Sequence, residues 1–256
     1  MRKALILAIG ICMIGLLSAQ AAGSADPRIG VTIDYTFASK YMWHGFNLYG
    51  SKTASQPSID LDFWQTGFGA MIWHSRANDG GFRNFEENDY IVYYGNSLFS
   101  DTPLAIDYNF SWLYYDYYDN SSRDVDLQEF IMGFSFPNLL PGGVTASYST
   151  GLLWPTRSSV PGLKNIGGWV HVFGLSRDVA VGEQVFSLMT DLTYNDGYAG
   201  GAVDHDWSHA TFGVSTSFTL WKNFTFTPAL YQQKSMDDSV NTHDDLWTSL
   251  SFAYRF

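Results

Sequence analysis

The fold is decided by a stretch in which every second residue is apolar, Val31-Thr-Ile-Asp-Tyr-Thr-Phe37. Side chains of a β-strand point alternately to its two faces, so this period of two predicts a strand with one apolar and one polar face. The same alternation returns at Ile59-Asp-Leu-Asp-Phe63, at Ile106-Asp-Tyr-Asn-Phe-Ser-Trp112 and over the last residues, 249–256. No segment after residue 30 has an apolar stripe at helical spacing, so we expect an all-β chain.

Clusters of Gly, Pro, Asn and Asp divide the chain into twelve candidate strands. Most of them have 9 to 13 residues. Strands of soluble sandwiches have about 5–6 residues, whereas a tilted membrane-spanning strand needs about 9–11. Long and short connections alternate, which is typical of a transmembrane barrel with long extracellular loops and short periplasmic turns. The strands are expected at residues 31–41, 55–64, 67–75, 85–95, 103–115, 127–136, 144–153, 165–175, 184–195, 206–220, 224–232 and 245–256.

Composition excludes several classes of protein. The chain has 256 residues and a net charge of −11, with 15% charged and 17% aromatic residues. It is too acidic for a nucleic-acid-binding protein, which usually presents a basic face, and too aromatic for a disordered chain. Helical membrane proteins need several apolar runs of about 20 residues, and none follows the first 20 residues.

The N-terminus has the three parts of a secretory signal peptide. Two basic residues, Arg2 and Lys3, precede an apolar run over 4–17, and Ala19-Gln-Ala21 is a cleavage signal. The alternative, a single membrane anchor, has too short an apolar run. We therefore expect a signal peptide at 1–21, a short periplasmic segment at 22–30 and an outer-membrane barrel at 31–256. The only cysteine, Cys12, lies in the signal, so the barrel is expected to hold no disulfide.

Aromatic residues help to distinguish a membrane barrel from a soluble sandwich, which uses the same alternation with its apolar face inward. Tryptophans gather near the predicted strand ends, where a membrane barrel carries its interfacial girdle. Core tryptophans of a soluble periplasmic β-protein, the alternative, would lie in mid-strand. The tryptophans concerned are Trp43, Trp64, Trp73, Trp154, Trp207, Trp221 and Trp247.

The C-terminal strand ends in phenylalanine after alternating apolar residues, Leu250, Phe252, Tyr254 and Phe256. This pattern resembles the signal by which the barrel-assembly machinery recognises outer-membrane proteins. A chance terminal Phe in a periplasmic protein is the alternative. Outer-membrane lipid and the assembly machinery are accordingly the expected partners, nucleic acid is not one, and no feature marks an oligomer interface.

Three segments near the start carry a family resemblance: residues 38–47 (ASKYMWHGFN), 56–62 (QPSIDLD) and 67–70 (GFGA). Together they resemble the opening of the TorF-type porins of Gram-negative outer membranes. His44 stands where many members have arginine. The resemblance implies an outer-membrane barrel with a pore, and it supplies neither a substrate nor catalytic residues.

The polar faces of the predicted strands carry carboxylates that would point into the lumen. Only Arg255 opposes them, so the expected channel passes small neutral or cationic solutes, because rings of carboxylates favour cations. Twelve strands lie between the ~8 that side chains fill and the ~16 that leave an open channel. A closed structural or adhesive barrel, filled by Met71, Tyr93, Ile131 and Met189, is therefore an open alternative. The predicted pore-lining residues are Asp34, Asp60, Asp62, Asp89, Asp107, Glu129 and Asp191.

Catalysis is the least favoured reading, and no cofactor is expected. Asp204-His-Asp206 and His243-Asp-Asp245 could meet at the barrel mouth of a hydrolase, with a carboxylate orienting a histidine base. These are also ordinary residues of exposed loops, and no nucleophile-elbow, zinc-protease or phosphate-loop motif accompanies them. The loops are acidic but contain no calcium-loop motif, so no metal site is expected either.

Overall fold

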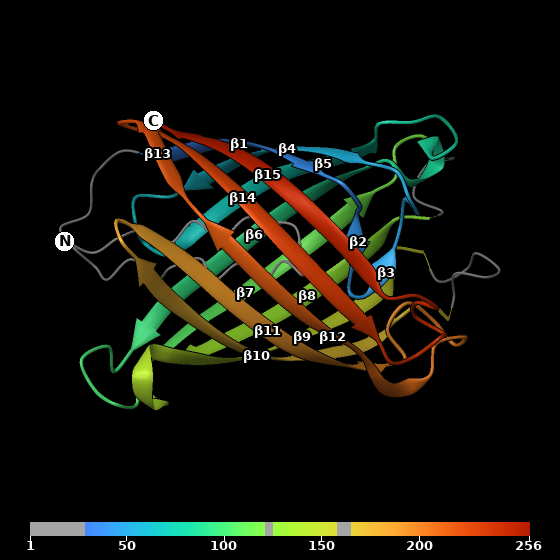
Figure 1. Cartoon of the computed structure of the whole chain (residues 1–256). Coiled ribbons are helices and arrows are strands. Elements are labelled where there is room, and N and C mark those ends of the chain that lie inside the picture. Colours follow the sequence, from blue (N-terminus) through green and yellow to red (C-terminus); the bar gives the residue numbers. More distant parts are fainter. Residues whose placement is uncertain (1–28, 121–124, 158–164) are drawn as a thin grey trace.

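Residues 29–120, 125–157 and 165–256 are described by a computed structural model, and they form a closed antiparallel barrel of twelve strands (Figure 1). The barrel strands are β1 (Gly30–Ala38), β4 (Ala54–Asp62), β5 (Phe68–Ala77), β6 (Glu87–Leu98), β7 (Ile106–Asp116), β8 (Leu127–Phe136), β9 (Val144–Pro155), β10 (Gly168–Val181), β11 (Gln184–Asp196), β12 (His205–Thr216), β14 (Phe224–Ser235) and β15 (Asp245–Arg255). β13 (Phe218–Trp221) prolongs β12, and β2 (Met42–Trp43) and β3 (Phe46–Asn47) form a separate hairpin. The two short 3₁₀ turns are η1 (Arg83–Phe85) and η2 (Pro141–Gly143).

Two pairings close the ring. β1 pairs with β15, from Thr32↔Arg255 to Ala38↔Ser249. β12 pairs with β14, and β13 continues along the same edge of β14. A ring without a free edge satisfies every ladder hydrogen bond within the protein, which is the condition for crossing a bilayer with strands.

The all-β fold class and the twelve predicted strands are confirmed, and most strand ends lie within three residues of the prediction. One difference has a consequence for the site. Residues 39–41 were expected at the end of the first strand, but β1 ends at Ala38 and the chain turns into the barrel mouth. β10 is also longer than expected and runs to Val181, because the turn to β11 consists only of Gly182 and Glu183.

The barrel wall has an apolar outer face and a polar inner face. Among the described residues, no helix is long and apolar enough to cross a membrane. The outer positions are large, exposed and apolar, which suits contact with hydrocarbon rather than water. They include Ile33, Tyr35, Ile59, Ile72, Val92, Phe173, Leu175, Leu188, Phe212, Leu230, Leu250 and Phe252.

The two ends of the barrel differ. Short connections, 63–67, 99–105, 137–143, 182–183 and 222–223, lie at the end where β1 starts and β15 finishes (Figure 1). Longer connections, 39–53, 78–86, 117–126, 156–167, 197–204 and 236–244, lie at the other end. By the predicted topology the first end is periplasmic and the second extracellular. The predicted signal peptide, 1–21, lies outside the described residues.

The predicted tryptophan girdle is only partly present. Trp64, Trp207 and Trp221 are exposed near strand ends, as a girdle requires. Trp73 and Trp247, however, face the lumen and are 5% and 2% exposed. They pack instead against Tyr41, 5.6 Å between ring centroids for Trp73, and Tyr231, 5.5 Å for Trp247. The girdle prediction was wrong for these two because position near a strand end does not determine which face a side chain occupies. Trp43 lies on β2, not in the barrel wall.

Candidate functional site

The first long connection, 39–53, folds into the mouth of the barrel at the end with the long connections. It carries the β2–β3 hairpin, which Figure 1 shows at the end away from the C-terminus. Side chains along this connection are buried, among them Tyr41, Met42, His44 and Tyr49. An exposed loop would leave such residues in water, so this connection is part of the lumen filling.

One side of the hairpin contacts the wall formed by β6, β7 and β8. The Tyr41 hydroxyl donates a hydrogen bond of 2.5 Å to Glu87 Oε1 on β6. The Trp43 ring lies edge-on to Tyr115 of β7, with 5.8 Å between centroids. His44 Nε2 lies 3.3 Å from Glu129 Oε1 on β8.

The other side of the hairpin contacts the facing wall. Gln233 Nε2 on β14 donates to the Gly45 carbonyl at 3.0 Å, and Asn241 Nδ2 donates to the same oxygen at 3.3 Å. Asn47 Nδ2 reaches Asp245 of β15 at 3.3 Å. In the order of strands around the ring, β14 and β15 lie opposite β6 to β8. The hairpin therefore crosses the bore and is fixed to both sides.

Gly45 is required at the tip of the hairpin. Its φ of +94° lies in the left-handed region that side chains disfavour. A Cβ there would lie 2.5 Å from His209 Nδ1 and 2.9 Å from Val240 Cγ1. The absence of a side chain lets the backbone approach His209 on β12, so this glycine determines how closely the hairpin meets that wall.

Three carboxylates lie on the wall that the hairpin faces: Glu87, Asp89 and Glu129. All three are at most 1% exposed. Tyr41 donates to Glu87, and Tyr115 donates to Glu129 Oε2. The Glu129 carboxylate occupies the space above Gly151 of β9, where a Cβ would lie 2.2 Å from Oε1. Glycine at 151 thus makes room for an acidic side chain lying flat on the wall.

A second group of carboxylates lies closer to the short turns and is only half-buried: Asp34, Asp60, Asp62 and Asp107. Each has a polar partner one or two strands away in the barrel wall. Ser251 Oγ donates to Asp34 at 3.1 Å, Tyr93 OH to Asp60 at 2.8 Å and Ser97 Oγ to Asp107 at 2.5 Å. Arg255 Nη2 lies 3.7 Å from Asp62 Oδ2. This part of the bore is therefore polar and reachable by water.

The structure places the seven predicted pore-lining carboxylates on inward positions of their strands. It does not gather them into one ring: four lie near the short turns, Asp89 and Glu129 lie beside the hairpin, and Asp191 lies on β11 opposite Thr211 of β12. That these seven carboxylates line an open, water-filled pore remains a prediction. Glu87, two positions before Asp89 on the same face, belongs with them and was missed, although the period of two pointed to it.

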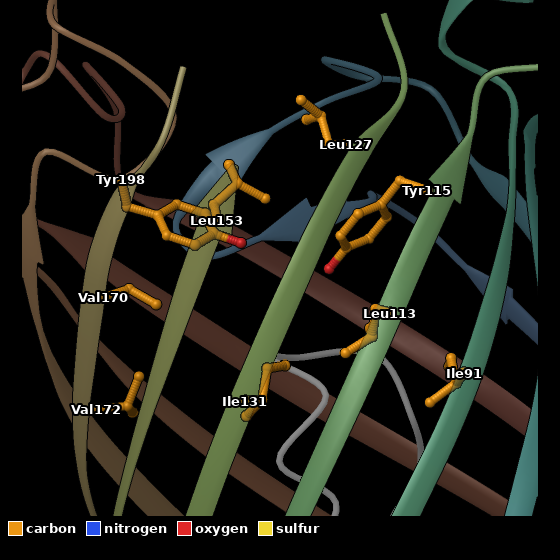
Figure 2. Packing of buried hydrophobic residues seen from close by; sticks show 9 residues of the cluster. All are labelled: Ile91, Leu113, Tyr115, Leu127, Ile131, Leu153, Val170, Val172 and Tyr198. Carbon is orange, nitrogen blue, oxygen red and sulfur yellow. The ribbon is translucent and has the colours of Figure 1, made fainter. Parts of the chain in front are cut away.

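Apolar side chains occupy the rest of this wall. Eight of them, including Ile91, Leu113 and Ile131, lie on the inner side of β6 to β10 and form a cluster with Tyr198 of the connection 197–204 (Figure 2). Trp43 and Phe46 of the hairpin pack against this cluster. Met71, Tyr93, Ile131 and Met189, the residues expected to narrow the bore, all take inward positions.

The residues of the hydrolase alternative have separate partners. His205 Nδ1 pairs with Asp196 at 2.5 Å, and the His205 side chain is largely exposed. Asp244 accepts hydrogen bonds from Lys234 Nζ at 2.7 Å and from the Ser235 N–H at 2.9 Å, and these donors hold the pKa of Asp244 below its usual range. Asp244 is thus engaged as the anchor of its loop. Among the described residues, no three potential ligands are placed to hold a metal ion.

Comparison with known proteins concerns the fold. No family model matches the chain, and no curated protein does. Three solved barrels match nearly their whole length. The NanC porin is 10% identical with a TM-score of 0.54, over 87% of this chain and 98% of that one. An outer membrane channel from Pseudomonas putida F1 is 8% identical with a TM-score of 0.52, over 89% and 94%. The KdgM porin is 13% identical with a TM-score of 0.51, over 88% and 99%.

The fold is that of a twelve-stranded transmembrane β-barrel, which this chain shares with these porins and this channel. Identities of 8–13% show the fold and leave the transported solute open. None of the three structures is described as TorF-type, so that narrower family resemblance remains a prediction.

Proposed function

We propose that this porin-like barrel is an outer-membrane diffusion channel of the TorF type for small neutral or cationic solutes. The observation that carries the proposal is the charge of the inner face. Carboxylates occur near both ends of the bore, whereas Arg255 is the one inward-facing cation of the barrel strands that the structure describes. Low-dielectric walls focus the field of such carboxylates, which raises the local concentration of cations. Anion-selective pores instead carry rings of Arg or Lys.

Location and assembly belong to the same proposal. The signal peptide, 1–21, would deliver the chain to the periplasm, and the assembly machinery would recognise the C-terminal strand. Leu250, Phe252 and Tyr254 are exposed on the outer face of β15, and Phe256 is also exposed. A solvent-accessible row of alternating apolar residues is what a receptor for the last strand can bind.

A second function, a closed structural or adhesive barrel, is favoured by one observation: the β2–β3 hairpin joins opposite walls. In this case the hairpin is a permanent plug. In the channel the hairpin narrows the bore, and solutes pass beside it or when it moves. Both functions predict the same fold and differ in permeability.

Swelling of proteoliposomes separates the two functions. Vesicles containing the refolded protein are moved into isosmotic solutions of a small neutral sugar, an alkylammonium salt or a sugar acid of similar size. The channel predicts rapid swelling with the first two and slow swelling with the acid. Swelling no faster than that of empty vesicles in all three solutions would support the closed barrel.

A further inference from the structure

Asp89 is a buried carboxylate that accepts no hydrogen bond from the described residues. It lies on the inner face of β6, fully buried, and neither of its oxygens has a hydrogen-bond partner among the described residues. Its cross-strand neighbours are aromatic: Trp73 on β5 and Tyr115 on β7. Burying an unpaired carboxylate is costly, so its charge must be compensated by a proton or by a bound cation.

The surroundings increase the need for a cation. Glu87 lies two positions before Asp89 on the same face of β6, and Glu129 lies on β8 of the same wall, both as deeply buried as Asp89. Glu87 accepts a hydrogen bond from the Tyr41 hydroxyl, and Glu129 accepts one from the Tyr115 hydroxyl. Asp89 accepts none from the described residues. His44 of the hairpin lies beside Glu129, at 3.3 Å from Oε1. Three carboxylates thus face one histidine, and Asp89 is the carboxylate left without a donor.

We infer that Asp89 binds a small, partly dehydrated monovalent cation on the inner face of β6, on the wall that the β2–β3 hairpin contacts. The inference rests on the proposed channel function, and it names the position at which a permeating cation pauses. Glu87 and Glu129 contribute long-range attraction. Trp73 and Tyr115, the cross-strand neighbours of Asp89, place aromatic rings on either side of it, and aromatic rings can attract cations.

A monovalent ion fits the position better than a divalent one. Ca²⁺ takes six to eight oxygen ligands and Mg²⁺ demands a near-ideal octahedron, but the described residues contain no group of three ligands placed for a metal ion. Conduction also requires a site that attracts an ion and then releases it. The Asp89 carboxylate alone would contact the ion, while Glu87 and Glu129 attract it from a greater distance, so the ion is bound weakly enough to leave.

Thallium(I), a dense substitute for potassium, tests the site without any need for conductance. Crystals of the wild-type protein, of D89N and of D191N are soaked in a thallium(I) salt, and anomalous difference maps are compared. Asp191 is a matched control because it is an inward, buried carboxylate on β11, away from the hairpin wall. D89N keeps the shape of the side chain, and heat-modifiable migration shows that each variant is folded.

The inference predicts a thallium peak in contact with the Asp89 carboxylate in the wild type and in D191N, and its loss in D89N. No peak in the wild type, or a peak that persists in D89N, would overturn it and leave a protonated Asp89. In a potassium chloride gradient, the inference also predicts a several-fold lower permeability ratio of K⁺ to Cl⁻ in D89N, and a smaller change in D191N. A wild-type barrel that conducts nothing refutes the channel, and the thallium maps still decide whether the cation site exists.

Discussion

His44 Nε2 lies 3.3 Å from Glu129 Oε1 inside the barrel, and both side chains are at most 3% exposed. This contact joins the tip of the β2–β3 hairpin to β8, while the Gly45 carbonyl next to it is held by Gln233 of β14. The width of the bore therefore depends on a hairpin whose two anchors lie on opposite walls.

Replacing residues 42–47 by a Gly-Ser linker of equal length should raise the single-channel conductance, because the hairpin occupies the middle of the mouth. A control replaces Gly80 and Gly81, an exposed part of another long connection, by Ser-Gly and keeps Asp79, the partner of Lys52. The control should conduct as the wild type does. Equal conductance in all three proteins would mean that the hairpin does not limit the path.

Gly45→Ala should destabilise the closed position of the hairpin. The left-handed φ alone costs a non-glycine residue about 1–2 kcal/mol, and the new Cβ also meets His209 Nδ1 at 2.5 Å. Gly50→Ala is the control, since Gly50 has a φ of +57° and open space around its Cβ position. The midpoint of unfolding in urea should fall more for Gly45→Ala, with more frequent gating in bilayers. Equal effects of the two substitutions would contradict the close packing against His209.

Removing charge from the half-buried carboxylates should weaken cation preference. The combined variant Asp60→Asn and Asp107→Asn should have a lower K⁺ to Cl⁻ permeability ratio, because the field inside the bore loses two negative charges. Reversal potentials in a salt gradient measure this ratio. Asp206→Asn, at an exposed position on β12, removes a charge outside the bore and should change the ratio little. An unchanged ratio in the double variant would show that ions do not pass these residues.

The extracellular ion pairs should respond to pH in a defined direction. The Lys234 ammonium and the Ser235 N–H lower the pKa of Asp244, and Lys52 lowers that of Asp79. A depressed carboxyl pKa stabilises the folded loop above the ordinary value of about 3.9, and this contribution is lost as pH falls through the lower folded value. Carbon-13 NMR titration should show the pKa of Asp244 rising in Lys234→Gln and unchanged in Lys52→Gln. A pKa of Asp244 that rises in Lys52→Gln and stays unchanged in Lys234→Gln would contradict these two pairings.

The C-terminal residue should matter for assembly more than for stability. Phe256 is 68% exposed, and its backbone N–H donates to the Val31 carbonyl at 2.9 Å. Phe256→Ala keeps that backbone bond, so refolding in detergent should be nearly unchanged. In cells the amount of folded barrel in the outer membrane should fall. If Phe256→Ala lowered refolding in detergent as much as it lowered the amount of folded barrel in cells, the ring would have a structural role and not a role in recognition.

Period-two patterning was sufficient to predict the twelve strands and the inward direction of residues such as Asp34 and Glu129. A strand shows its two faces in its own sequence, and neighbouring strands agree because they share one sheet. The hairpin was not predictable in this way. Residues 39–53 have no period that records where a loop folds, and their position depends on partners as distant in sequence as Gln233 and Asp245.

The tryptophans also show what the sequence pattern could not predict. Trp73 and Trp247 lie near strand ends, as predicted, yet they face the lumen, where Trp73 packs against Tyr41 and Trp247 belongs to the same cluster as Met42. The phase of alternation along β5 and β15 already places them beside Ser75 and Ser249 on the inner face. Face must therefore be determined before proximity to a strand end is interpreted.

Single-channel recording of the refolded wild-type barrel in planar bilayers, with a potassium chloride gradient across the membrane, tests the central claim most directly. The channel predicts discrete conductance steps and a reversal potential of the sign that marks cation preference. A heat-modifiable, membrane-inserted barrel that gives no steps would contradict the channel and establish the hairpin as a permanent plug.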